Sequence, residues 1–149
     1  MLRQGIERLR RADEGSALIE VALVLPLLLI LAFGVVGIGR VVQAKMGVEA
    51  VVREAARVAS LAETGEAAAG RGLAVGQAVA SGYGLTNGSL ALSVNPGSFE
   101  RGGEVQASAR YDVSLGDLPL LGWLHASVAG EHSERIDLYR SRWQAGRGP

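Results

Sequence analysis

The sequence contains no cysteine, and only 5% of its residues are aromatic. Without cysteine the chain can form no disulfide, no thiolate metal site and no cysteine nucleophile, and cysteine usage gives no information on the redox compartment. Lys and Arg number 15, as do Asp and Glu, so no net field draws the protein to nucleic acid or to an acidic surface. Abundant glycine and alanine favour a slender, loosely packed protein over a dense enzyme.

Sequence motifs of catalysis and metal binding are also missing. No G-x-S-x-G, H-E-x-x-H or Walker sequence occurs. His125 and His132 lie seven apart in an expected strand, which would place them on opposite faces and prevent a local metal pair. We interpret Glu131, Glu134 and Asp137 as a solvated strand edge. We therefore predict no enzyme activity, metal or cofactor, and no nucleic-acid or small-molecule partner.

One long apolar run dominates what is present. No charged side chain occurs from Val21 to Gly39, a run of about 19 residues that would span about 28 Å as a helix, close to the thickness of a hydrocarbon core. Pro26 and the glycines of this run would weaken a soluble core helix, but lipid-embedded helices tolerate both residue types. We predict a transmembrane helix over residues 16–39 that is kinked at Pro26.

Basic residues precede this run and define its expected orientation. Four arginines occur in the leader, residues 1–15, and positive charge near the end of a membrane helix favours the cytoplasmic side. We expect a single-pass protein of the cytoplasmic membrane with a cytoplasmic N-terminus and an extracytoplasmic C-terminal domain. Membrane lipid is therefore an expected partner.

The junction between leader and apolar run has an unusual order. The small residues Gly15 and Ser16 stand before the run, whereas an ordinary secretory signal has small residues after it. Glu20 is an ionisable residue at the membrane boundary and needs a partner. A cut after Gly15 would create an α-amine on Ser16, mostly protonated at neutral pH because its pKa is about 7.7 to 8.0. That amine could pair with Glu20 of the same chain or of a neighbour.

A glycine, four residues, a glutamate and an apolar span behind a basic leader resemble the class III signal of type IV prepilins and pseudopilins. In that family a membrane-embedded aspartyl peptidase, the prepilin peptidase, cuts after the glycine on the cytoplasmic face. The resemblance implies that Gly15 precedes the cut, Ser16 becomes the mature N-terminus and Glu20 is the assembly glutamate. Two positions depart from the pattern: Ser16 stands where many pilins have phenylalanine, and Val21 where small tight-adherence pilins have tyrosine.

Residues 40–69 lack proline and carry apolar residues at helical spacing, which predicts one amphipathic membrane-proximal helix. On physical grounds Arg53, Glu54 and Arg57 are a solvated face of it. The segment Arg53-Glu54-Ala55-Ala56-Arg57 also resembles the R-E-A-A-R stretch just past the membrane helix of TadE-like proteins of the tight-adherence secretion system. That resemblance covers the leader, the span and the extension to about Ser60. It implies a pseudopilin-like minor component or accessory of a pilus assembly machine, whose partners are other pilins, pseudopilins and membrane components.

The remaining sequence predicts an extracytoplasmic α+β head over residues 70–140 and a flexible tail over 141–149. Glycines at 65, 70 and 72 punctuate the chain before a short helix over 73–80. Apolar alternation predicts strands over 90–94, 105–115 and 123–139, which form an antiparallel sheet covered by the long helix. The apolar segment 117–124 either closes the core, which we favour, or rests on the membrane or a partner through Trp123.

Two classes of function follow from these patterns. The first is a structural subunit of a tight-adherence pilus system that is cleaved after Gly15 and remains with the assembly machine or enters the pilus. The second is an uncleaved single-pass membrane protein whose head is a binding module in the cell envelope. The residue at the mature N-terminus, Ser16 or Met1, distinguishes them.

Overall fold

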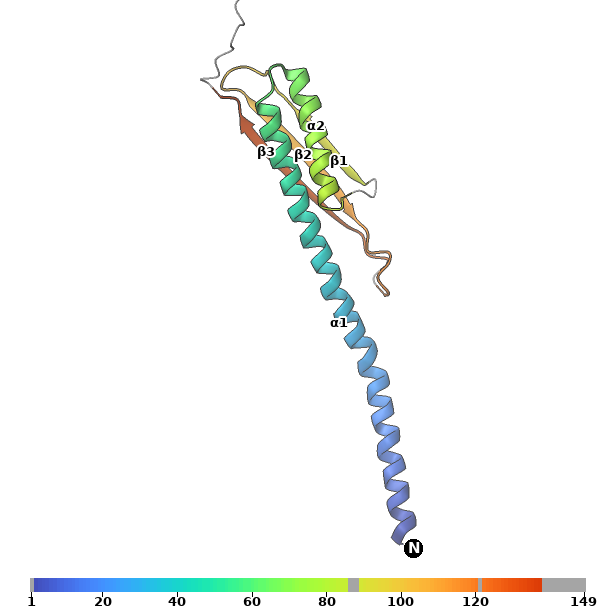
Figure 1. Cartoon of the computed structure of the whole chain (residues 1–149). Helices are drawn as coiled ribbons and strands as arrows, with labels where there is room; N and C mark the ends of the chain where they lie inside the picture. The colour runs from blue at the N-terminus through green and yellow to red at the C-terminus, as the bar shows by residue number, and fades with distance from the viewer. Residues whose placement is uncertain (1, 86–88, 121, 138–149) are drawn as a thin grey trace, which may run out of the picture. The chain divides into compact units, whose positions relative to one another are not determined.

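The computed structural model describes residues 2–85, 89–120 and 122–137, with side chains from residue 17 onward. Its elements are α1 (Leu2–Ser60), α2 (Gly65–Gly82), β1 (Leu90–Asn95), β2 (Glu104–Val113) and β3 (Ala126–Arg135) (Figure 1). The predicted α+β class, with a long N-terminal helix and a three-stranded antiparallel sheet, is confirmed. The chain divides into two compact units: one holds the residues up to Gly39 together with Leu115–Leu124, and the other holds the remainder.

In the first unit α1 carries Pro26 in its interior. Proline has no amide hydrogen, so the carbonyl of Ala22, four residues earlier, receives no helical hydrogen bond from position 26. The helix nevertheless continues without interruption to Ser60. A bend at Pro26 stays a prediction.

The loop Leu115–Leu124 belongs to the same unit, and its apolar side chains fall into two groups. Leu115 and Leu118 are buried, as core closure requires, whereas Leu120, Trp123 and Leu124 are 56%, 74% and 37% exposed. Core closure is therefore correct for the first two side chains and wrong for the last three. Leu121 lies outside the described residues.

In the second unit α1 buries one stripe of small and β-branched residues. Their spacing of three and four residues matches the helical period, so they share one face. The buried positions are Ala44, Gly47, Val48, Val51, Val52, Ala55, Ala56, Ala59 and Ser60. The predicted amphipathic helix is confirmed up to Ser60, where it ends.

The end of α1 at Ser60 corrects the single helix expected over residues 40–69. A second helix begins at Gly65, capped by Thr64, whose hydroxyl accepts a hydrogen bond from the amide of Ala67 at 3.2 Å. Glu66 in the first turn favours this start because its charge complements the helix dipole. The helix expected over 73–80 is therefore longer at both ends, and it runs through Gly70 and Gly72.

Buried small residues recur at every fourth position of α2, at Ala68, Gly72, Gly76 and Ala80. A Cβ atom built on Gly72 would lie 3.0 Å from the backbone oxygen of Ala55. One built on Gly76 would lie 3.3 Å from the Ala55 Cβ. These glycines therefore allow α2 to approach α1 closely. We call the contact of Gly72 and Gly76 with Ala55 the small-residue seam.

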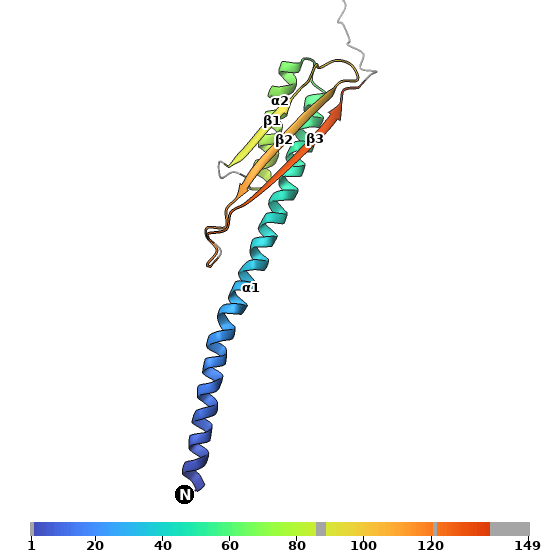
Figure 2. The ribbon, with the colours of Figure 1, turned by 180° about the vertical axis from the view of Figure 1, so that it is seen from behind.

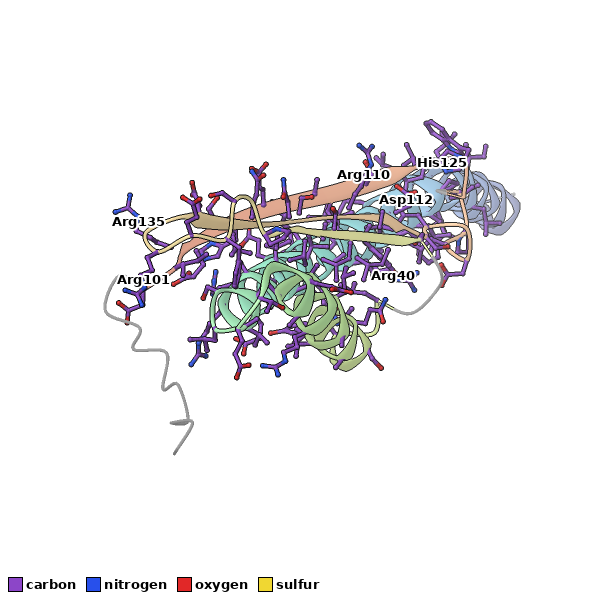
Figure 3. The ribbon with its side chains drawn as sticks, turned by 90° about the horizontal axis from the view of Figure 1, so that it is seen from above. Arg40, Arg101, Arg110, Asp112, His125 and Arg135 are labelled. Atoms are coloured by element: carbon purple, nitrogen blue, oxygen red, sulfur yellow. The ribbon has the colours of Figure 1, made fainter. Side chains whose placement is uncertain are left out.

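The sheet has the order β1-β2-β3, and all neighbours are antiparallel. Both helices lie on one face of it, as Figure 2 shows. Along β2 burial alternates residue by residue, as the sequence predicts. On β3, Gly130 leaves room for α1, since a Cβ there would lie 3.1 Å from Val48 Cγ1. The opposite face is polar and carries Arg110, whose side chain points away from the helices (Figure 3).

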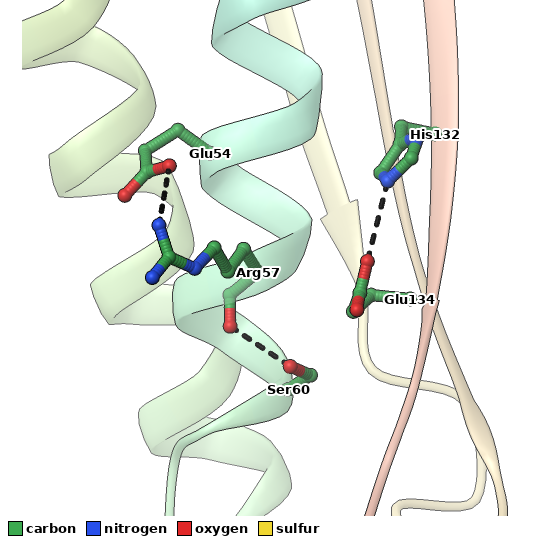
Figure 4. Close-up of polar contacts among 5 residues, drawn as sticks. All are labelled: Glu54, Arg57, Ser60, His132 and Glu134. Carbon is green, nitrogen blue, oxygen red and sulfur yellow. Dashed lines mark hydrogen bonds and ion pairs between the residues drawn. The ribbon is translucent and has the colours of Figure 1, made fainter.

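The third strand is shorter than expected, since it begins at Ala126. His125 precedes it, so the prediction that both histidines lie in one strand is wrong. His132 does lie in β3, where its Nε2 stands 3.3 Å from a carboxylate oxygen of Glu134 (Figure 4). Glu131 is exposed on an edge strand as expected, whereas Glu134 is half-buried. Residues 138 and 139, and the tail over 141–149, lie outside the described residues.

The free side of β3 is approached by Lys45 of α1. The Lys45 ammonium donates a hydrogen bond of 2.7 Å to the backbone carbonyl of Ala129 and also pairs with Glu49 at 3.2 Å. One backbone carbonyl of this edge strand is therefore hydrogen-bonded to a side chain of the long helix.

Candidate functional site

The surface of the predicted span is apolar and has almost no protein cover. Among the described residues, one helix is long and apolar enough to cross a membrane, Ala17–Ser60, and only 6% of its most apolar 18-residue window is buried. A core helix of a soluble protein would be mostly buried. Large side chains such as Leu23 and Ile38 are 72% and 67% exposed. Single-pass anchoring in a membrane accounts for this surface.

The residues of the predicted processing site lie within α1. Gly15, Ser16 and Glu20 are helical, and the Glu20 side chain is exposed. Ser16 and Glu20 are four residues apart, so they lie on one helical face, separated by about 6 Å along the axis. A cationic amine on Ser16 would therefore be about one helical turn from Glu20.

A continuous helix across Gly15 also has a consequence for proteolysis. Peptidases generally bind the scissile bond in an extended conformation, as in strand-like peptide recognition. If the chain is cut after Gly15, the residues around it must first leave the helix. Glycine lowers the cost of this step, because it is about 1 kcal/mol less favourable than alanine in a helix interior.

The R-E-A-A-R segment divides between packing and solvent. Ala55 and Ala56 are fully buried, and Ala55 forms the α1 side of the small-residue seam. Alanine is required at position 55 because any larger side chain would occupy the space left by Gly72 and Gly76. The alanines of the segment therefore hold the head on the long helix.

The charged residues of the segment face solvent, as physical reasoning predicts. Arg53 and Arg57 are exposed, and Arg57 pairs with Glu54 at 3.6 Å. The backbone carbonyl of Arg57 accepts a hydrogen bond of 2.8 Å from Ser60, near the helix end (Figure 4). An exposed pair of this kind contributes little to folding, so these charges are available to a partner.

Among the residues that the structure describes, no group of three or more His, Asp or Glu side chains is placed to hold a metal ion. His132 and Glu134 form a pair without a third ligand.

The long helix thus combines an uncovered apolar surface, an exposed carboxylate near its start and a buried alanine pair further along. Residues 15–57 match the family model of the TadE-like proteins. The predicted resemblance is confirmed over that TadE-like segment, which is less than a third of the chain. The TadE-like segment begins at Gly15 and ends at Arg57, so it includes every site residue predicted from the sequence. No curated protein and no solved structure gives a significant match.

Similarity to the TadE-like family suggests a protein associated with the Tad pilus. Such a protein interacts with the membrane and with other pilus components. The roles of Gly15, Ser16, Glu20 and Pro26 stay predictions.

The small-residue seam was missed by sequence reasoning. Its signal was present, since small residues recur with a period of four from residue 68 to residue 80. Glycine was interpreted as a helix end, which is its commoner meaning. The competing meaning, close approach of two helices, depends on a partner that is far away in the sequence.

Proposed function

We propose that the protein is a minor pseudopilin or accessory subunit of a tight-adherence pilus system, anchored by one membrane helix and processed by the prepilin peptidase. The observation that carries the proposal is the TadE-like segment itself, in which an uncovered apolar helix leads directly into a tightly packed small head. The helix would pack with spans of other subunits in the membrane. The head would stay outside the cytoplasm and contribute to the tip, the start or the base of the filament.

Cleavage after Gly15 is the first step of this proposal. The protein is extracted from membranes of cells that contain the peptidase, and its intact mass and N-terminal residue are measured. We expect Ser16 as the first residue, and Met1 in cells with an inactive peptidase.

A matched pair of variants sharpens this experiment. Gly15→Val places a β-branched residue before the cut and should leave the leader attached, whereas Gly5→Val makes the same change elsewhere in the leader and should be cleaved. Recovery of the wild-type protein with Met1 from cells with active peptidase would contradict processing. That result would favour the alternative, an uncleaved single-pass protein whose head is a binding module in the envelope.

Charge pairing of Glu20 is the second step. Glu20→Gln preserves size and removes the charge, so the protein should still enter the membrane but recover fewer pilus components in co-purification. Glu49→Gln is the matched control, because Glu49 is exposed in the second unit and pairs with Lys45. Equal recovery of pilus components with Glu20→Gln and wild type would show that this pairing is wrong.

A further inference from the structure

The loop Leu115–Leu124 connects β2 and β3 but belongs to the compact unit of the predicted span. Two leucines hold it in place, since Leu115 and Leu118 are buried and the amide of Leu118 donates to the Leu115 carbonyl at 3.0 Å. The rest of the loop presents Leu120, Trp123 and Leu124 outward. An anchored base and an exposed apolar tip are therefore combined in one short segment.

The tip has a defined conformation. The Trp123 indole N–H donates to the Leu120 carbonyl at 3.0 Å, so its polar group is satisfied within the loop while 74% of the residue remains exposed. Leu120 has a φ of 67°, in the left-handed region that a branched residue rarely adopts. Backbone strain of this kind persists only where surrounding contacts impose it, and it is typical of functional sites.

The composition of the loop favours lipid over a charged partner. It contains no lysine or arginine, and Asp117 is its one charged residue. Attraction to anionic headgroups therefore cannot hold it, whereas tryptophan and leucine favour the membrane–water interface. The span in the same compact unit exposes an apolar surface that only lipid or other spans can cover. The exposed tip belongs to the same compact unit as that surface.

We propose that Leu120, Trp123 and Leu124 form a second membrane contact, which inserts into the lipid interface beside the span. This membrane wedge rests on the anchoring of α1 in the bilayer and not on cleavage or pilus assembly.

The test uses the full-length chain in phosphatidylcholine vesicles. Trp143→Phe leaves Trp123 as the single tryptophan, since the sequence contains two. Its fluorescence is compared in vesicles whose lipids carry bromine near the headgroup, carry bromine deep in the acyl chain, or carry none. We expect bromine near the headgroup to quench the Trp123 fluorescence at least twofold more strongly than bromine deep in the acyl chain. This ratio should be the same at low and high salt, because the loop contains no lysine or arginine. Equal emission in all three vesicles would overturn the membrane wedge.

Two controls separate this result from a failure of anchoring. Vesicle flotation reports whether the protein is in the bilayer: floating protein with unquenched Trp123 overturns only the wedge, whereas protein that does not float overturns the anchoring as well. Trp123→Phe retains Trp143 as the reporter and should lose the difference between shallow and deep bromine. A third outcome is that bromine fails to quench Trp123 in vesicles, while added pilus components protect it from acrylamide in the aqueous phase. In that case a protein, and not lipid, covers the tip, and the membrane wedge is wrong.

The matched variant Leu120→Ser, in the Trp143→Phe background, tests the tip itself. It removes one apolar side chain while keeping the strand ends unchanged. We expect weaker shallow quenching of Trp123 with unchanged flotation. Quenching equal to that of the parent would show that the tip does not insert as a unit.

Discussion

Two regions of α1 differ in what surrounds them. From Ala17 to Ala32 every residue is exposed, and most are large and apolar. From Ala44 to Ser60 the buried stripe is made of small or β-branched residues, and charged residues occupy the solvent side. One helix is therefore built for two environments. Large side chains maximise contact with lipid or neighbouring spans, whereas small ones allow a second helix and a sheet to approach the backbone.

The largest expected effect separates membrane anchoring from folding of the head. The double change Leu28→Arg and Leu31→Arg should abolish membrane association, because each arginine at the centre of a span costs about 2.5 to 3.5 kcal/mol. The measurement is the membrane-bound fraction after alkaline extraction. Gln43→Arg, at an exposed position just before the second region, should leave that fraction unchanged. Full membrane retention of the double variant would contradict a lipid-facing span.

A large side chain in the second region should have the opposite consequence. Ala55→Leu overfills the small-residue seam and should destabilise the head by about 2 to 3 kcal/mol, while leaving the membrane fraction unchanged. Thermal unfolding of the detergent-solubilised protein measures the effect. Ala78→Leu places the same side chain at an exposed position of α2 and should change stability by about 0.5 kcal/mol or less. Equal stabilities of the two variants would show that the seam is not tightly packed.

Two glycines of α2 sharpen the comparison further. A methyl group on Gly72 would meet the Ala55 backbone oxygen, the Ala59 Cβ and Val94 Cγ1 at 3.0 to 3.2 Å, whereas nothing lies within 4 Å of one on Gly70. We expect Gly72→Ala to lower the free energy of unfolding by about 1 kcal/mol. Gly70→Ala should raise it by about 0.5 to 1 kcal/mol through helix propensity. Thermal unfolding of the detergent-solubilised protein measures both variants. Changes of the same sign in the free energy of unfolding would contradict a close approach of α2 to α1.

The smallest effect on folding belongs to the charged residues of the R-E-A-A-R segment. Glu54→Gln removes the exposed pair with Arg57 and should change stability by about 0.5 kcal/mol or less. Co-purification of pilus components is measured on the same variant. A loss of partners with unchanged stability would assign these charges to assembly, and retention of both would leave the alanines as the functional part of the segment.

Features with a local physical cause could be predicted from the sequence. The exposed span follows from an uninterrupted apolar run, and the buried face of β2 follows from alternation between Val105 and Val113. The stripe on α1 follows from its period of three and four. Each of these patterns depends only on whether a side chain faces water, lipid or the protein core. That environment can be inferred from the residues close to it in the sequence.

Features that depend on distant partners could not be predicted. Gly72 ends no helix, because Ala55 lies opposite it. The two histidines do not share a strand, because β3 begins only at Ala126, after a loop that belongs to the other compact unit. The division of the loop into buried Leu118 and exposed Trp123 also requires a three-dimensional arrangement. The motif at Gly15 and Glu20 could be recognised, but its chemistry depends on an enzyme and on neighbours that the chain itself does not contain.

Subunits confined to a membrane reach high local concentrations, and an uncovered strand in each head would invite heads to join edge to edge. The ammonium of Lys45, bonded to the Ala129 carbonyl, blocks one position along β3 and brings a hydrated charge to that side. Strand addition at this position of β3 is thereby discouraged.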